Sequence, residues 1–150
     1  LDTSVIYAPT AMFKAQTFKK YGQYNVEHVI EDYSMWLKIL SSGGKIFNVD
    51  KNWAYYRVNQ VISRSKIDWY YKGLVQVFAE YIKDPIVLKA LKKRKFKYLI
   101  KVTVFDGLRS LEVIGKTRSE LSLVQLIVLY SITVLPAFIR NILKKRINKA

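Results

Sequence analysis

Two adjacent carboxylates, Glu31 and Asp32, are the residues of this chain with the clearest capacity for chemistry. A carboxylate at the edge of a pocket acts as a general base when a hydroxyl group lies within hydrogen-bonding reach, and it then contributes about 10²–10⁴ in rate. The pair also stands where a helix is predicted to begin, and the unpaired N–H groups and dipole of a helix N-terminus favour negative charge. An acidic helix start without a catalytic role is therefore the alternative interpretation.

The helix predicted to position this pair runs from about residue 26 or 27 to residue 42, and two glycines end it. Apolar residues recur on one face at helical spacing, which predicts that this face is buried. They are Ile30, Tyr33, Leu37 and Leu40, with Trp36 beside them. Asp32 shares a stripe with Met35 and Ile39, so we expect its carboxylate to lean toward the protein.

The segments around this helix have the composition of strands as well as helices. Val5–Pro9, Lys45–Asp50 and Trp53–Val58 are rich in β-branched and aromatic residues and are predicted to be strands. A short helix is expected over Gln16–Lys20, and a polar loop over Asn59–Lys66. Strands and helices mixed in so short a segment predict an α/β or α+β fold for this part of the chain.

From Asp68 onward the apolar pattern is helical. Asp84-Pro85 is predicted to end one helix and start the next, because proline is well tolerated at the first helical position. Gly107 and Gly115 are expected to bound a short further helix.

Net charge also differs between the first part of the chain and the helical second part. The 150 residues carry a net charge of +15, of which residues 1–60 hold only +2 (seven Lys/Arg, five Asp/Glu) and residues 61–150 hold +13 (nineteen against six). Such a basic segment is expected to meet an anionic membrane surface or nucleic acid. The chain has no cysteine, which excludes disulfides and thiolate metal sites. It opens on Leu1 without a signal segment, and we expect it to be part of a longer protein.

Four segments, taken in order, resemble the C-terminal half of a family 2 glycosyltransferase catalytic domain, which has the GT-A fold. They are Pro9–Lys14, Tyr21–Asn25, Glu31–Leu37, and Tyr55–Asn59 followed by Ser63–Ser65. The resemblance covers about two-fifths of the chain. The order and spacing of the four segments together are more specific than any one segment alone. It implies an α/β fold: a partial GT-A half-domain on the acceptor side over residues 1–66, followed by an all-helical basic extension over residues 67–150.

The resemblance also implies roles for the acidic pair. Asp32 would be the general base of an inverting transfer, taking the proton of the acceptor hydroxyl as that oxygen attacks the anomeric carbon. Glu31 would orient the base or bind the acceptor. The substrates implied are a nucleotide-sugar donor and a lipid-linked or surface-polysaccharide acceptor.

Four further residues are candidates for substrate binding. Trp36 offers an aromatic face on which a sugar could stack, and a packed core residue is the alternative. Arg57, Ser63 and Arg64 belong to a segment that resembles the loop closing over the donor diphosphate, where they would bind phosphate oxygens. A solvated loop with ordinary surface arginines is the alternative there.

The sequence departs from the family pattern in three places. The Asp-x-Asp motif, which would bind a divalent metal (Mg or Mn) and the diphosphate in the full-length enzyme, is absent from this chain and is expected upstream of it. Asn59 stands where many relatives have a histidine, so no metal ligand is predicted here. The Gln-x-x-Arg-Trp motif of processive synthases is also absent, which favours transfer of a single sugar. Alone, the chain is expected to be inactive.

An uncharged stretch, Leu121–Ile139, is followed by a cluster of basic residues. Nineteen residues of helix reach about 28 Å, barely the thickness of a bilayer core. We therefore expect 121–147 to be a membrane-associated helix, peripheral or monotopic on the cytoplasmic face, with a bend at Pro136. A buried helix packed on protein is the alternative.

Two rival functions remain for the chain, and the first of them rests on the basic segment. One is a non-catalytic module that binds a membrane or nucleic acid, and the other is a degenerate glycosyltransferase that partners an active one. We expect no nucleic-acid partner, because no recognisable nucleic-acid motif occurs and the aromatic residues fall at core spacing.

Overall fold

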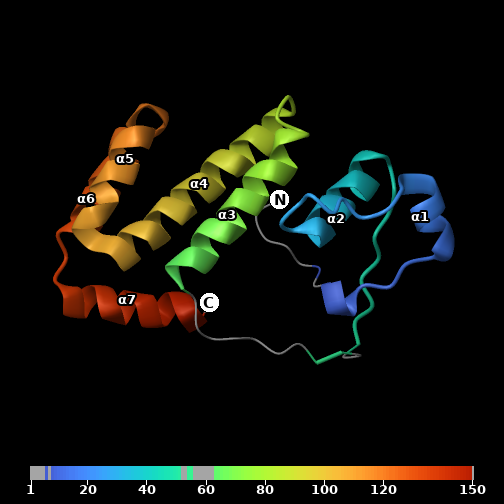
Figure 1. Cartoon of the computed structure of the whole chain (residues 1–150), viewed down its shortest axis with the longest axis horizontal. Coiled ribbons are helices and arrows are strands. Elements are labelled where there is room, and N and C mark those ends of the chain that lie inside the picture. The colour runs from blue at the N-terminus through green and yellow to red at the C-terminus, as the bar shows by residue number, and fades with distance from the viewer. Residues whose placement is uncertain (1–5, 7, 52–53, 56–62, 150) are drawn as a thin grey trace.

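The computed structural model describes residues 6, 8–51, 54–55 and 63–149, and within these residues the fold is all-helical (Figure 1). The elements in chain order are η1 (Ala8–Thr10), α1 (Ala15–Tyr21), α2 (Glu31–Ser41), α3 (Arg64–Ala79), α4 (Pro85–Asp106), η2 (Gly107–Ser110), α5 (Leu111–Thr117), η3 (Arg118–Glu120), α6 (Leu123–Thr133) and α7 (Ala137–Lys149). The antiparallel pair of α3 and α4 occupies the middle of the molecule, with α1 and α2 at one end and α5 to α7 at the other.

The predicted α/β fold, a partial GT-A half-domain over residues 1–66, is wrong for the described residues, because none of them forms a strand. Lys45–Asp50 has strand-favouring residues but no regular structure, and all of its side chains are exposed, Phe47 by 82%. A strand needs a neighbour that pairs with its backbone N–H and C=O groups, and no described segment pairs with this one. Strand propensity alone therefore did not decide the structure.

The other two predicted strands are only partly described. Within Val5–Pro9, the chain enters the single-turn helix η1 at Ala8. Of Trp53–Val58, only Ala54 and Tyr55 are described, and they have no regular structure. The remaining residues of both predictions lie outside the described residues.

Helix α2 begins at Glu31, four or five residues later than predicted. Asn25 forms a turn instead: its side-chain oxygen accepts the Glu27 N–H at 3.1 Å, and its carbonyl accepts the His28 N–H at 3.2 Å. This local hydrogen bonding competes with helix formation, as asparagine commonly does. The acidic pair consequently lies in the first turn of α2.

The central helices begin at side chains that cap them. The Ser63 hydroxyl accepts the Lys66 N–H at 3.1 Å, so α3 starts at Arg64, earlier than predicted. The Asp84 carboxylate accepts the Ile86 N–H at 2.7 Å, which confirms the predicted start of α4.

One hydrophobic cluster joins α2 to α3 and to the first turns of α4. Its buried members are Ile30, Tyr33, Met35, Trp36, Ile39, Leu74, Val77, Phe78, Val87 and Ala90. Gly73 lets the chain approach closely here, because a Cβ at that position would lie 3.1 Å from the Cβ of Val29. The cluster crosses the predicted boundary between residues 66 and 67, and that division into two domains stays a prediction.

A second, smaller cluster holds the other end of the molecule together. It is formed by Leu99 of α4, Ile114 of α5 and Leu129 of α6, each almost completely buried. A capping box starts α6: the Ser122 hydroxyl accepts the Gln125 N–H at 3.2 Å, and the Gln125 side chain accepts the Ser122 N–H at 3.0 Å.

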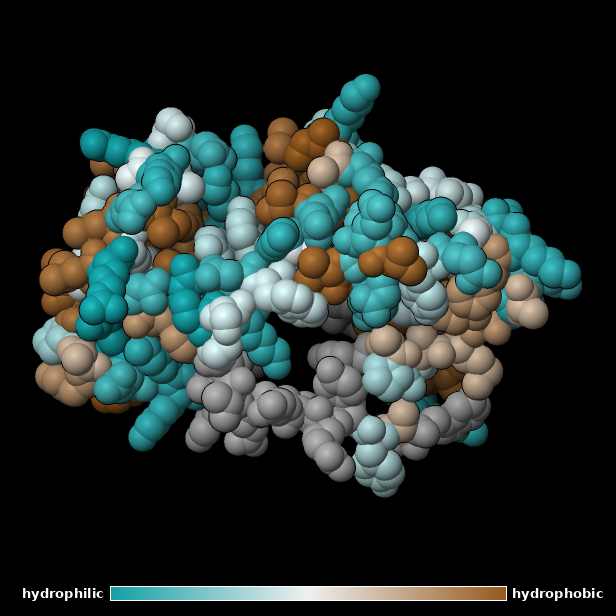
Figure 2. Space-filling view, viewed as in Figure 1, coloured by the Kyte–Doolittle hydropathy of each residue, from teal (hydrophilic) through white to brown (hydrophobic). Residues whose placement is uncertain are grey.

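The uncharged segment is bent. Leu123–Thr133 and Ala137–Ile147 meet at 115°, which confirms the predicted bend next to Pro136. Among the described residues no single helix has the length and hydropathy to cross a membrane; the bent pair reaches that threshold only when its two helices are counted together. Leu123, Val134 and Phe138 are 73%, 72% and 67% exposed, and Figure 2 shows hydrophobic side chains along the edge formed by α6. The membrane association predicted for 121–147 stays a prediction.

Candidate functional site

The acidic pair lies on a firmly anchored helix turn. Glu31 is exposed, whereas Asp32 is half-buried and its Oδ1 accepts the Tyr33 N–H at 2.7 Å. The pKa of Tyr24 is raised, first by burial and then by the negative charges of Asp32 and Glu31. Both carboxylates are thus close enough to influence this phenol.

The face of α2 that anchors the pair differs in part from the prediction. Tyr33, Met35, Trp36 and Ile39 are buried, as the stripe containing Asp32 requires. Leu40, predicted to be on the buried face, is 49% exposed, although Ile39 in the same turn is buried; the buried face is therefore centred on Met35, Trp36 and Ile39.

Trp36 occupies the position of a core residue. It is only 5% exposed, and its ring stacks on Phe13 with centroids 5.1 Å apart and an angle of 16° between the planes. Its indole Nε1 is buried without a hydrogen-bond partner among the described residues. A sugar would have to displace Phe13 to reach this ring, so the core alternative matches the observed packing.

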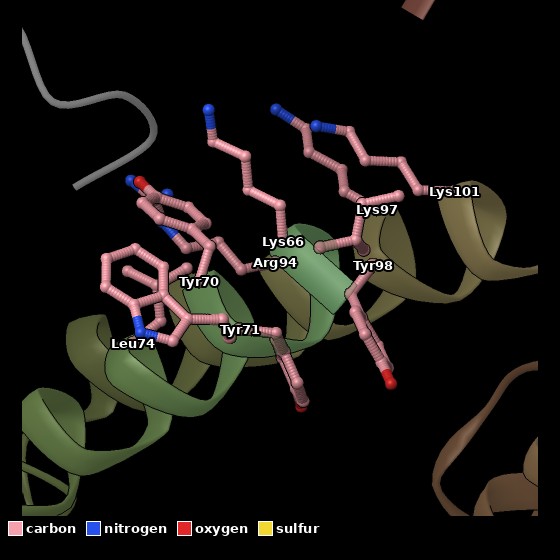
Figure 3. Close-up of a pocket in the computed structure, with 10 residues that line it drawn as sticks. Lys66, Tyr70, Tyr71, Leu74, Arg94, Lys97, Tyr98 and Lys101 are labelled. Atoms are coloured by element: carbon pink, nitrogen blue, oxygen red, sulfur yellow. The ribbon is translucent and has the colours of Figure 1, made fainter. Parts of the chain in front are cut away.

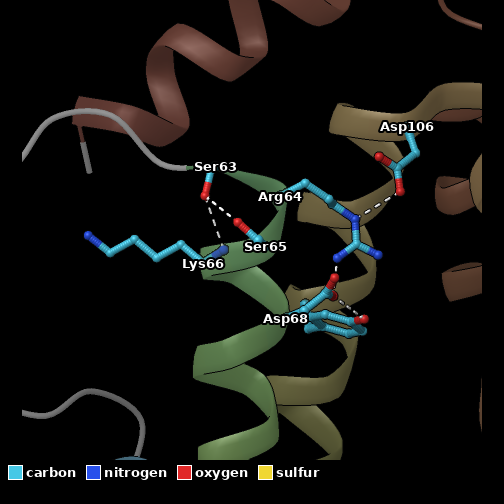
Figure 4. A network of polar contacts seen from close by, with 7 residues as sticks. Ser63, Arg64, Ser65, Lys66, Asp68 and Asp106 are labelled. Atoms are coloured by element: carbon cyan, nitrogen blue, oxygen red, sulfur yellow. Dashed lines mark hydrogen bonds and ion pairs between the residues drawn. The ribbon is translucent and has the colours of Figure 1, made fainter.

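Arg64, predicted together with Ser63 to bind the donor diphosphate, belongs to a network between α3 and α4, whereas the Ser63 hydroxyl bonds within the first turn of α3 (Figure 4). The Arg64 Nε donates to Asp106 Oδ2 at 2.8 Å, and a second guanidinium nitrogen pairs with Asp68. The Tyr98 hydroxyl also donates to Asp68, at 2.7 Å. Burial alone would lower the pKa of Arg64, but its hydrogen bonds to Asp68 and Asp106 outweigh that effect and raise the pKa.

This network gives Arg64 a structural role in joining the start of α3 to the end of α4. Its charge is already matched by two carboxylates, so phosphate binding would require the network to open. Ser63 caps the helix and contacts the Ser65 hydroxyl at 2.9 Å. Arg57 lies outside the described residues.

The structure does not bring the two predicted groups together. Gly73 of α3 lies close to Val29, which comes just before α2. Along α3, Gly73 is nine residues after Arg64. Nine residues of helix correspond to about 14 Å. Glu31 and Asp32 are therefore at one end of α3, and Ser63 and Arg64 at the other (Figure 1).

Sequence reasoning missed a cleft of about 230 Å³ between α3 and α4. It is lined by Lys66, Ile67, Trp69, Tyr70, Tyr71, Leu74, Arg94, Lys97, Tyr98 and Lys101. Figure 3 shows Lys66, Lys97 and Lys101 extending to the same side of the two helices, while the rings of Tyr71 and Tyr98 point to the opposite side. These two rings stack with centroids 4.1 Å apart.

The charges around the cleft are unevenly distributed. None of the three lysines forms an ion pair with a described carboxylate. Partial burial and then the neighbouring positive charge of Lys97 lower the pKa of Lys101. Arg94 supports the floor, with its guanidinium 5.7 Å from the ring centre of Tyr33 and 6.0 Å from that of Phe78.

One signal in the sequence could have indicated this cleft. Lys97 and Lys101 are four residues apart and so share one face of α4. Lys66 lies more than thirty residues earlier, and only the α3–α4 pairing brings it to that face.

Comparison with protein-family models, with curated proteins and with solved structures finds no match to this chain.

Proposed function

We propose that this chain contributes the acceptor side of a glycosyltransferase, with Asp32 as the general base. The observation that carries the proposal is the position of Asp32: its carboxylate is half-buried in the first turn of α2, while the next turns of that helix are fixed in the core. A base needs such a rigid support together with access to substrate. The order of the four family-like segments supports the same assignment.

The reaction we propose is the inverting transfer that the resemblance implies. The Asp32 carboxylate accepts the proton of the acceptor hydroxyl, whose oxygen forms a bond to the anomeric carbon of the nucleotide-sugar. The bond between that carbon and the diphosphate oxygen breaks, and its electron pair leaves with the nucleoside diphosphate. Attack on the face opposite the leaving group inverts the configuration. Glu31, exposed beside the base, binds or orients the acceptor.

No step is assigned to a metal in this chain. The described residues contain no group of three or more His, Cys, Asp or Glu that could hold a metal ion. A divalent metal, Mg or Mn, stays a prediction about the Asp-x-Asp segment expected outside this chain.

The second part of the proposal is that the α6–α7 end of the molecule docks on an anionic membrane surface. Val134 and Phe138 expose apolar side chains at the bend, and Lys145 and Arg146, about two helical turns after Phe138 on α7, are exposed as well. Each basic residue near anionic headgroups contributes about 1 kcal/mol. Docking on the cytoplasmic leaflet would give access both to nucleotide-sugars and to a lipid-linked or surface-polysaccharide acceptor.

The test uses the longer protein that carries the donor-binding segment. Release of nucleoside diphosphate is measured with a panel of nucleotide-sugars and membrane acceptors, for the wild type and for Asp32→Asn and Glu31→Gln. We expect Asp32→Asn to lower kcat by about 10²–10⁴ with unchanged donor binding and an unchanged circular dichroism spectrum. Near-normal turnover in Asp32→Asn would rule out the assignment. Glu31→Gln should raise the KM for the acceptor, as expected of a residue that binds or orients it. Glu27→Gln, at an exposed carboxylate four residues before Glu31, controls for the loss of one negative charge.

A further inference from the structure

We propose that the cleft between α3 and α4 binds a phosphate ester, with its anionic group among Lys66, Lys97 and Lys101 and its apolar part against Trp69 and Tyr70. This site goes beyond the proposed transfer reaction, since it does not include Asp32 or Glu31. Its ligand class is a phosphorylated amphiphile, such as a lipid headgroup with a terminal phosphate.

The first support is the arrangement of charge. The three ammonium groups extend to one side of the helix pair (Figure 3), although like charges gathered in this way repel each other. The nearby carboxylates Asp68 and Asp106 are engaged by Arg64 instead, and Asp68 also accepts from Tyr98, whose ring points away from the lysines. Positive charge without a described counter-charge is the arrangement that an anionic ligand would stabilise.

The second support is the apolar surface beside the lysines. Trp69 and Tyr70 line the cleft and are 53% and 40% exposed, so they place apolar ring surface beside the lysines. Leu74, buried at 3% exposure, closes the floor. A ligand with an apolar part next to its phosphate would cover this surface as well as the charge.

The size of the cleft favours one headgroup over a polymer. Its volume of about 230 Å³ is below the about 300–1,000 Å³ typical of sites for drug-sized ligands. Nucleic acids are usually held by an extended basic track with successive stacked bases, whereas these three lysines line one small cleft, with Lys97 and Lys101 one helical turn apart on α4.

The experiment compares two variants of equal net charge in the full chain. The cleft variant carries Lys66→Gln, Lys97→Gln and Lys101→Gln. The control carries Lys83→Gln, Lys89→Gln and Lys92→Gln, three exposed lysines that do not line the cleft. Circular dichroism verifies that both variants fold, as expected for exposed side chains.

Binding is measured in two arms. Inorganic pyrophosphate is titrated by calorimetry, and flotation is measured with phosphatidylcholine vesicles containing phosphatidic acid, against vesicles of equal surface charge containing phosphatidylserine. The wild type should bind pyrophosphate at one site and prefer phosphatidic acid. The cleft variant should bind pyrophosphate about a hundredfold more weakly, since each lysine contributes roughly fivefold near an anionic group. The control should stay within about threefold of the wild type.

A third variant separates the two parts of the ligand. Trp69→Ala should weaken flotation with phosphatidic acid and leave pyrophosphate binding unchanged. Asp32→Asn should change neither, so this proposal and the transferase proposal fail independently. Equal losses in the cleft and control variants, the absence of binding in both arms, or tighter binding of single-stranded nucleic acid that depends on the same lysines would each overturn the proposal.

Discussion

The structural role of Arg64 can be tested by a double-mutant cycle with Asp106. Arg64→Ala, Asp106→Ala and the double variant remove the two ends of one contact, the 2.8 Å hydrogen bond between Arg64 Nε and Asp106 Oδ2. This contact ties the first residue of α3 to the last residue of α4. If Arg64 were a surface residue kept for phosphate binding, its removal would affect stability little.

The magnitude follows from the exposure of the two side chains. A charge-assisted hydrogen bond contributes about 1.5–3 kcal/mol when buried, and an exposed ion pair about 0.2–1 kcal/mol. The side chains of Arg64 and Asp106 are 27% and 29% exposed, which places them between these limits. We expect a coupling energy of about 1–2 kcal/mol for the pair. Arg64→Ala alone should cost about 2–3 kcal/mol, because it also leaves Asp68 without its guanidinium partner.

The assay is urea unfolding followed by circular dichroism, with the free energy of unfolding extrapolated to water. Arg109→Ala is the control, because Arg109 is an exposed arginine on η2 at the same end of α4. Its effect should stay within about 0.5 kcal/mol. A coupling energy below about 0.3 kcal/mol for Arg64 and Asp106 would refute the structural role and return Arg64 to the list of candidate phosphate ligands.

Three further predictions concern stability. Trp36→Ala should lower the free energy of unfolding in urea by about 3–5 kcal/mol, because the stacking on Phe13 is lost. Trp36→Phe should lower it clearly less, because the indole N–H has no described partner to lose. Equal losses in the two variants would contradict this. Burial raises the pKa of Tyr71 to about 12 from 10.0, with smaller contributions from the stacked Tyr98 and from Glu120. Stability should therefore fall as pH rises between these values, because the unfolded phenol ionises first. The fall should be shallower in Tyr71→Phe, where other tyrosines with a raised pKa such as Tyr24 remain, and an unchanged fall would contradict this. Gly107→Ala should lower the melting temperature, because Gly107 has φ +59°, a backbone conformation that alanine adopts only with strain. The Arg140 guanidinium, at the end of a flexible side chain, would also have to move away from the new Cβ. An unchanged melting temperature would contradict the strain.

The helices were largely predictable from the sequence because their signals are local. Asp84-Pro85 starts α4, and Gly107 ends it with a positive φ, as such residues do in most helices. The predicted strands failed because a strand depends on a partner. Lys45–Asp50 has the right composition, but no described segment supplies the backbone groups it would pair with.

The candidate sites show the same difference between features with local signals and features that depend on distant contacts. The period of the apolar residues predicted that Asp32 lies on a core helix. It did not predict that Asp32 lies in the first turn, because the turn at Asn25 delays the start of the helix to Glu31. The sequence did not predict the ion pair of Arg64 with Asp106, because only the pairing of α3 with α4 brings these two residues together. The lysine cleft was missed for the same reason, since Lys66 and Lys97 meet across that pairing.

The central claim is that Asp32 removes the acceptor proton, and single-turnover transfer by Asp32→Asn tests it most directly. In the longer protein, with donor and acceptor both saturating, the rate of sugar transfer should fall by about 10²–10⁴ while the donor Kd stays at the wild-type value. Transfer at a rate close to that of the wild type, with the same donor Kd, would contradict the claim.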